Sequence, residues 1–304
     1  MTAFEWLLLF ALSVLWGGSY FFNEIGLTGL PPLWIIALRL IVGALVLWVL
    51  VFARKLPVPR SLGVWLAFIS MAAINNVIPF FLITWGQTAT SAGFASIMNA
   101  ATPIFAVFIA GAFLADEPLT KRKLAGATLG LAGVAILMGP GAFAGADTNL
   151  LARLALLGAA LAYAISGVYG RRFREMGVQP LVAAAIQLTM ATLLAVPLVL
   201  SVEGPASLAN ANTNAWLAVI GLGMFSTALA YILYFRLLAS AGATNLMLVT
   251  LLIPVTAILL GVLILSETLV INQLLGMAVI AFGLSVIDGR LWKRFRNTKE
   301  HPHG

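Results

Sequence analysis

The fold is decided by a stretch that the chain contains twice. The first copy is Asp116-Glu117-Pro118-Leu119 with Gly126 and Gly133 behind it, and the second is Ser266-Glu267-Thr268-Leu269 with Gly276 and Gly283. Ser13-x-x-Trp16-Gly17 and Tyr163-x-x-Ser166-Gly167 recur at the same separation of 150 residues, about half the chain. Self-similarity at a fixed spacing is typical of proteins built from structural repeats. We therefore expect one repeat over 1–149, a second over 150–289 and a basic tail at 290–304.

Composition places these repeats in a membrane. Hydrophobic residues make up 62% of the chain and charged residues 9%, with a mean hydropathy of +1.06, whereas soluble domains carry about a quarter charged residues. The apolar runs do not alternate with polar residues as barrel strands do, and each approaches the roughly 20 residues with which a helix crosses the hydrocarbon core. The predicted fold is all-α, a polytopic membrane protein with ten transmembrane helices at 4–22, 33–53, 63–83, 93–114, 123–139, 150–169, 180–200, 215–236, 244–265 and 271–288.

The basic residues indicate how the chain is oriented. If ten spans alternate, all of the 17 Lys and Arg residues except Arg39 and Arg153 fall on one side of the membrane. An excess of Lys and Arg marks the cytoplasmic side, so both termini are predicted to be cytoplasmic. A net charge of +7 placed in this way favours a topology anchor over nucleic-acid binding.

Five spans in each half mean that the second repeat enters the membrane from the opposite side. The loops reflect this inversion, because Lys121-Arg122-Lys123 follows Glu117 whereas the matching Val270-Ile271-Asn272 follows Glu267. Two inverted five-helix units leave a cavity near the midplane, and rocking one unit against the other gives alternating access. The alternative is a repeat that serves only packing in a rigid membrane protein.

This pattern resembles the EamA branch of the drug/metabolite transporter superfamily, whose members have ten helices in two EamA repeats. The likeness covers about residues 1–289. The residues that carry it are Leu15-Trp16-Gly17-Gly18-Ser19, Arg39, Thr102-Pro103 and Asp116-Glu117-Pro118-Leu119, with Ile253-Pro254 and Ser266-Glu267-Thr268-Leu269 in the second half. The resemblance implies a bacterial inner-membrane exporter of amino acids or related metabolites, and it extends to the aromatic amino-acid exporter group.

Prolines inside the spans predict hinges. Pro103 cannot donate to the carbonyl of Asn99, and Pro254 likewise frees the carbonyl of Thr250. Pro79 does the same to Asn75. We expect Pro79, Pro103 and Pro254 to be hinges beside the cavity; the alternative is packing kinks that neighbouring helices satisfy.

Polar and aromatic side chains at mid-depth are the candidate solute contacts. Ser96, Asn99 and Pro103 share one side of a helix by their spacing. Trp16 and Tyr163 lie mid-span beside glycines, which favours rings that stack on a solute over rings in a headgroup belt. The predicted substrate-binding residues are Trp16, Ser19, Tyr20, Arg39, Asn75, Asn76, Phe80, Ser96, Asn99, Tyr163, Ser166, Gln187, Tyr231 and Thr250.

Arg39 is the basic residue that lies well inside a span. A charge there is costly, so its side chain should face a polar interior or a partner. It binds a substrate carboxylate or forms a gate on one interpretation, and bonds helix-end carbonyls on the other. Gln187 occupies roughly the related position in the second half.

Several chemistries are disfavoured by what the sequence lacks. There is no Cys, and both histidines, His301 and His303, lie in the tail, so we expect no metal, no cofactor and no enzymatic site. No Asp or Glu lies mid-span, so no proton carrier is evident and facilitated transport is favoured; Glu5 and Glu24 remain distal candidates. Glycines in the fifth and tenth spans predict close backbone packing between the repeats rather than a dimer contact, and we expect a monomer.

The predicted function is export of a small solute across the bilayer by alternating access. An aromatic, mostly uncharged cavity with a single Arg suits amphipathic zwitterions, that is, aromatic or neutral amino acids. A multidrug, nucleoside or metabolite exporter is the alternative. A channel or a non-transporting scaffold is a further one.

Overall fold

The structure is a computed structural model that describes residues 1–114, 118–139, 149–246 and 248–288, and these residues form helices and connections without strands. Asp116 and Glu117, which belong to the repeated motif, and the tail 290–304 lie outside the described residues. The elements of the first half are α1 Ala3–Gly26, α2 Pro32–Ala53, α3 Leu62–Ala72, η1 Ala73–Val77, α4 Ile78–Gly86, α5 Ala92–Asn99, α6 Thr102–Phe113 and α7 Lys121–Met138.

The second half repeats this order of elements. Its elements are α9 Leu150–Tyr169, η2 Gly170–Met176, α10 Pro180–Val202, η3 Pro205–Asn210, α11 Thr213–Gly223, η4 Met224–Leu229, α12 Ala230–Ala241, α13 Ala243–Leu246, α14 Val249–Ile264 and α15 Ile271–Asp288. By position, α9 corresponds to α1, α10 to α2, α11–η4–α12 to α3–η1–α4, and α15 to α7.

In the described part of the chain, seven helical segments are long and apolar enough to cross a membrane, and Val249–Ile264 and Ile271–Ile287 are shorter apolar helices. Helix α7 has 18 residues but begins with the basic Lys121-Arg122-Lys123. The all-helical architecture is therefore confirmed for the described residues. The count of ten crossings stays a prediction.

Local chemistry explains where the helices begin. Thr2 and Glu5 form a reciprocal capping box at the start of α1, which satisfies amide groups that have no partner within the helix. The side chain of Ser91 caps α5 and that of Asn212 caps α11. Pro32 occupies the first turn of α2, where a missing N–H costs nothing.

The third helical span of each repeat, α3–η1–α4 in the first half and α11–η4–α12 in the second, is interrupted by a π-helical turn. Residues 63–83 were predicted as one span with a kink at Pro79; the structure has η1, which ends at Val77, two residues before that proline. The second half has η4 at the related place although it contains no proline there. Wide turns of this kind are often found at functional sites, and here they carry Asn75 and Asn76 in one half and Ser226 and Thr227 in the other.

The predicted kink at Pro103 is a full break. Helix α5 ends at Asn99 and α6 begins at Thr102. The Asn99 carbonyl, which Pro103 cannot reach, accepts a hydrogen bond from Thr102 Oγ1 at 2.8 Å. The freed acceptor is therefore satisfied within the chain.

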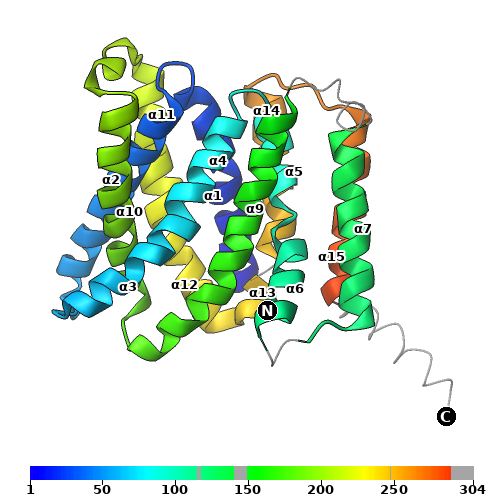
Figure 1. The fold of residues 1–304 in the computed structure, drawn as a ribbon, viewed down its shortest axis with the longest axis horizontal. Coiled ribbons are helices and arrows are strands. Elements are labelled where there is room, and N and C mark those ends of the chain that lie inside the picture. Colours follow the sequence, from blue (N-terminus) through cyan, green and yellow to red (C-terminus); the bar gives the residue numbers. More distant parts are fainter. Residues whose placement is uncertain (115–117, 140–148, 247, 289–304) are drawn as a thin grey trace.

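The two halves interleave so that most contacts occur in related pairs. Helix α1 contacts α11 and α14, and its counterpart α9 contacts α4 and α6. Helix α2 packs against its own counterpart α10. The N-terminus and the end of α15 lie at the same end of the bundle (Figure 1). The core is thus shared between the repeats.

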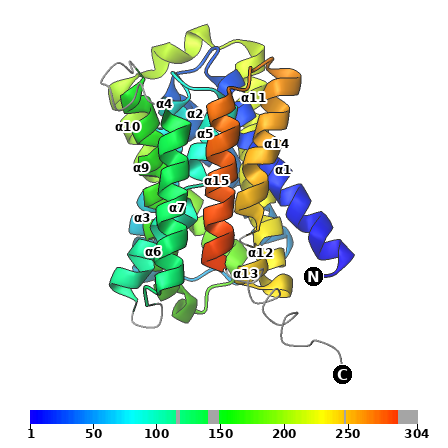
Figure 2. The same ribbon diagram turned by 90° about the vertical axis from the view of Figure 1, so that its right-hand side faces the viewer.

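Helices α7 and α15 stand side by side (Figure 2) at one edge of the bundle (Figure 1), and we call their contact the glycine seam. A Cβ atom at Gly126 would lie 2.7 Å from the carbonyl oxygen of Gly283, and one at Gly276 would lie 2.9 Å from that of Gly133. Only glycine permits this approach. Because Gly126 meets Gly283 while Gly133 meets Gly276, the two related helices run antiparallel, and the predicted close packing between the repeats is confirmed.

Candidate functional site

A set of buried and half-buried polar side chains links the two halves, and we call it the polar layer. Its members come from α2, from both π-helical turns and from the helices packed beside them. They are Arg39, Asn75, Asn76, Ser166, Gln187, Thr227 and Tyr231.

Arg39 on α2 is 7% exposed. Its Nε donates to Thr227 Oγ1 at 2.8 Å, and its guanidinium carbon lies 3.7 Å from the centroid of the Phe80 ring. Tyr20, Tyr163 and Tyr231 are near enough to interact electrostatically with it. Within the described part of the chain, no hydrogen bond or ion pair reaches the two terminal nitrogens, so this cation has aromatic neighbours but no counter-ion.

Gln187 on α10 makes the related contact with the opposite half. Its Nε2 donates to Asn76 Oδ1 at 2.6 Å. Arg39 and Gln187 thus each reach from the second helix of one repeat to the π-helical turn of the other. The symmetry of the fold is kept, while the chemistry differs because only one of the two contacts carries a charge.

Tyr231 and Ser166 extend the layer across the interface. Asn76 Nδ2 and Asn75 Nδ2 lie 3.3 and 3.5 Å from the Tyr231 hydroxyl, and Ser166 Oγ donates to Asn75 Oδ1 at 2.8 Å. Side-chain hydrogen bonds therefore link α12, η1 and α9. Such bonds exchange partners more readily than a packed core rearranges.

Other predicted site residues lie outside this layer. Trp16 packs against Tyr234 with ring centroids 5.7 Å apart, and Tyr20 lies near the Asn99 side chain. The hydroxyls of Ser19 and Ser96 donate to carbonyls of their own helices, those of Trp16 and Gly93. Thr250 is half-buried on α14.

Sequence reasoning left Thr227 out of the predicted site, although it is the hydrogen-bond partner of Arg39. The sequence feature that could have identified Thr227 is the polar Ser226-Thr227 pair within an otherwise apolar span. Gln87 was also left out, and it is 3% exposed with three side-chain hydrogen bonds. Among the described residues, no group of three or more His, Asp or Glu side chains is placed to hold a metal ion.

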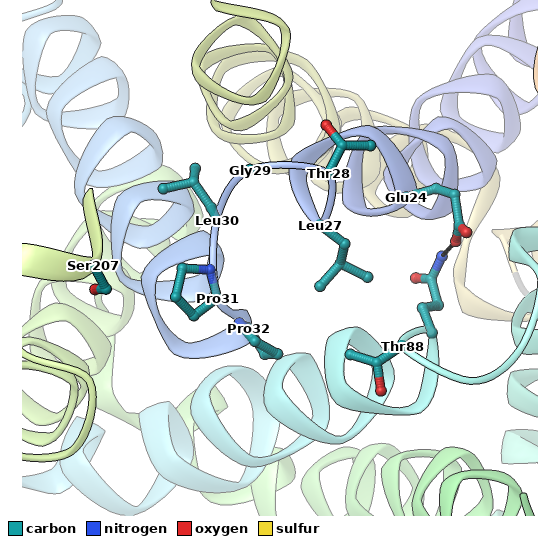
Figure 3. A pocket seen from close by; sticks show the side chains of 10 residues that line it. Glu24, Leu27, Thr28, Gly29, Leu30, Pro31, Pro32, Thr88 and Ser207 are labelled. Carbon is teal, nitrogen blue, oxygen red and sulfur yellow. Dashed lines mark hydrogen bonds between the residues drawn. The ribbon is translucent and has the colours of Figure 1, made fainter. Parts of the chain in front are cut away.

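A pocket of 610 Å³ opens where α1 meets α2, at the end of the bundle opposite the N-terminus, and we call it the α1–α2 pocket. Figure 3 shows Glu24 and Thr88 on one side of it, Leu30 and Pro31 across from them, and Leu27 projecting between. Gln87 Nε2 donates to Glu24 Oε2 at 3.2 Å. A second pocket, of 420 Å³, lies beside the start of α5, and Arg153 and Glu267 line it.

Glu203 joins the halves next to the α1–α2 pocket. Its two carboxylate oxygens accept hydrogen bonds from the backbone N–H groups of Leu33 and Trp34 at 3.1 and 3.2 Å, at the N-terminus of α2. Partial burial raises the pKa of this carboxyl, and the two backbone hydrogen bonds act in the opposite direction. The acid neutralises the positive end of the α2 dipole.

Comparisons with known proteins agree with this duplicated architecture. The model of the EamA-like transporter family matches residues 3–139 and again 150–287. A solved crystal structure superposes with a TM-score of 0.68 and 22% identity, covering 97% of this chain and all of the other. At that identity the likeness concerns the fold alone.

Relatives of similar length have been named as transporters. The uncharacterized inner membrane transporter YedA of Escherichia coli (strain K12) is 28% identical over 92% of this chain and 89% of its own length. A probable amino-acid metabolite efflux pump of the same organism is 26% identical over 97% of this chain and 98% of its own length. The uncharacterized transporter YoaV of Bacillus subtilis (strain 168) is 24% identical over 91% of this chain and 94% of its own length.

Proposed function

Because the chain belongs to the EamA-like transporter family, we propose that it exports aromatic or neutral amino acids, or related small metabolites, across the bacterial inner membrane by alternating access. The observation that carries this proposal is the polar layer. It lies between two interleaved halves and contains a buried cation without a counter-ion among the described residues.

The proposed topology has ten crossings in two inverted five-helix repeats, with both termini in the cytoplasm and the chain acting as a monomer. Three observations support it. The related helices α7 and α15 run antiparallel; the N-terminus and the end of α15 lie at one end of the bundle; and the basic Lys121-Arg122-Lys123 begins α7 at that same end. An excess of basic residues marks the cytoplasmic side.

The proposed solute carries a carboxylate and an apolar or aromatic body. The terminal nitrogens of Arg39 offer the donors that a carboxylate needs, while Phe80 and the nearby tyrosines offer ring faces. The name of the Escherichia coli relative, a probable amino-acid metabolite efflux pump, points to the same class of solute.

The proposed cycle exchanges hydrogen bonds between the repeats for hydrogen bonds to the solute. Arg39 releases Thr227, and Gln187 releases Asn76, when the halves rock apart. The π-helical turns, together with Pro79, Pro103 and Pro254, supply the places where the helices bend. No covalent chemistry, metal or cofactor takes part.

We propose that transport runs down the solute gradient. The acidic residues of the spans stand near helix ends, as Glu5 and Glu24 do on α1, and not in the polar layer. An imposed pH gradient should therefore leave the initial uptake rate in proteoliposomes unchanged. A rate that follows the pH gradient would contradict this part of the proposal.

Counterflow in proteoliposomes tests the function itself. Vesicles preloaded with an unlabelled solute should accumulate the same labelled solute when it is an aromatic or neutral amino acid. Trp16→Ala and Asn99→Ala should each slow this exchange, because both side chains are predicted solute contacts, and in the fold Trp16 packs beside Tyr234 and Asn99 lies near Tyr20. Transport by both variants at the wild-type rate would place the solute elsewhere. Absence of exchange for every amino acid and nucleoside tested would end the proposal.

A further inference from the structure

The α1–α2 pocket contains a single ionisable side chain, and that side chain is a carboxyl. Of the residues that line its 610 Å³, Glu24 alone is ionisable. This volume lies in the range of sites that hold small molecules, roughly 300–1,000 Å³. A pocket of this size with one carboxylate selects for a cation.

The carboxylate of Glu24 is held in position but only partly satisfied. Its Oε2 accepts from Gln87 Nε2, whereas Oε1 has no hydrogen-bond partner in the described part of the chain. Gln87 is itself fixed, because it also donates to the Tyr20 carbonyl at 2.9 Å and accepts from Asn23 Nδ2 at 3.1 Å. One oxygen of an oriented carboxylate is therefore left to a ligand (Figure 3).

The surroundings do not compensate this charge. The positive end of α2, which borders the pocket, is already capped by Glu203. The other acid within electrostatic reach is Glu267, which repels Glu24. Arg153 lies with Glu267 in the neighbouring pocket, where its guanidinium stands 5.0 Å from the Phe94 ring.

The remaining lining is amphipathic. Thr28, Thr88 and Ser207 bring hydroxyl groups, and Leu27 and Leu30 bring apolar surface. Hydroxyl oxygens complete the hydrogen bonds of a three-donor ammonium group, while the leucines cover an apolar body. An inorganic cation would leave that apolar surface unused.

We propose that the α1–α2 pocket binds the primary ammonium group of a small amphipathic molecule, with Glu24 as the counter-ion. Its place on an export route rests on the proposed function, whereas the binding itself does not. Tyr20, which interacts with Arg39, lies one turn before Glu24 on α1. A zwitterionic solute that moves along α1 would thus meet Arg39 of the polar layer, which projects from α2, and the carboxyl of Glu24 in succession.

Direct binding to the purified protein tests this site, with phenethylammonium as the probe in isothermal titration calorimetry. Wild type should bind it about tenfold more tightly than the neutral 2-phenylethanol, since tenfold corresponds to about 1.4 kcal/mol, the strength of one hydrogen bond to a charged group. Glu24→Gln should remove that preference and Glu24→Asp should keep most of it. Glu5→Gln, the same change at the other end of α1, should have no effect.

Two outcomes would overturn the site. The first is equal affinity of wild type for phenethylammonium and 2-phenylethanol, a comparison that requires no variant to fold. The second is an unchanged preference in a folded Glu24→Gln protein. Binding that depends on Glu24 without any counterflow would contradict the proposed function and leave the proposed site intact. Counterflow without binding that depends on Glu24 would contradict the site and leave the proposed function intact.

Discussion

The glycine seam brings backbone against backbone, whereas the polar layer joins the same two halves through side chains. In the seam, an added methyl group at Gly126 or Gly133 would meet main-chain atoms of the other helix within 3 Å. In the layer, Arg39 and Gln187 reach across the interface with hydrogen bonds. Packed backbones allow few alternative arrangements, but hydrogen bonds can pass to a solute. The difference suggests a fixed edge at α7 and α15 and movable contacts in the centre.

Gly133→Ala should have the largest effect and should act on folding. The new Cβ would lie 2.7 Å from the Ile280 nitrogen and 2.9 Å from the Gly276 oxygen, so the helices must separate. Overpacking costs about 1–3 kcal/mol, and thermal unfolding in detergent measures it. Gly167→Ala is the matched control, because no atom lies within 4 Å of its added Cβ. Equal losses of unfolding free energy in the two variants would mean that the glycine seam has room for a methyl group.

Arg39→Gln should come next and should act on transport. It removes the charge while keeping a donor for Thr227. Loss of one hydrogen bond to a charged group costs about 2 kcal/mol, or about 30-fold in the KM for a carboxylate-bearing solute. The unfolding temperature should change little. An unaltered KM, against Arg54→Gln as the exposed control, would assign Arg39 a structural role.

Gln187→Ala removes the uncharged counterpart of that contact and should have a smaller effect. A neutral hydrogen bond contributes about 1 kcal/mol, so KM or the exchange rate should change by about fivefold. The ratio between the two variants measures how much the charge adds beyond the shared geometry. If Gln187→Ala were as damaging as Arg39→Gln, the charge would not distinguish the two contacts.

Glu203→Gln should have the smallest effect. The amide oxygen still accepts from the N-terminus of α2, and only the attraction of a charge to the helix dipole is lost, about 0.5 kcal/mol. Thermal unfolding with and without high salt should show a small difference that salt removes. A loss of unfolding free energy comparable with that of Gly133→Ala would mean that the contact of Glu203 with the N-terminus of α2, and not the glycine seam, holds the halves together.

The location of helices was largely predictable. The expected span 33–53 corresponds to Pro32–Ala53, and the expected 150–169 corresponds to Leu150–Tyr169. The η4 turn was not predicted, because it contains no proline and the polar Ser226-Thr227 pair within it does not by itself indicate a π-helical turn. Within this turn Thr227 Oγ1 donates to the Leu222 carbonyl at 3.0 Å and accepts from Arg39 Nε at 2.8 Å, and the second of these bonds exists only in the folded bundle.

The candidate site was predictable as a set of residues but not as a set of partners. Asn76 and Gln187 were both expected to contact solute, yet nothing in the chain indicates that they bind each other 111 positions apart. Glu24 was noted as an acid near a helix end, and its pocket depends on Gln87 and on the α1–α2 connection. Which side chains become hydrogen-bond partners depends on how the helices cross. The residues around each side chain in the sequence do not indicate that crossing.

What the amino-acid sequence indicated by itself is the duplication and the helical spans, together with a prediction of the side on which the charged loops lie, because apolar run length and the cost of burying charge act on local segments. The tertiary structure alone decided which polar groups meet. A membrane favours pairing of buried polar groups, and only the interleaving of the two halves determines that Arg39 Nε finds Thr227 while Glu24 keeps one oxygen for a ligand.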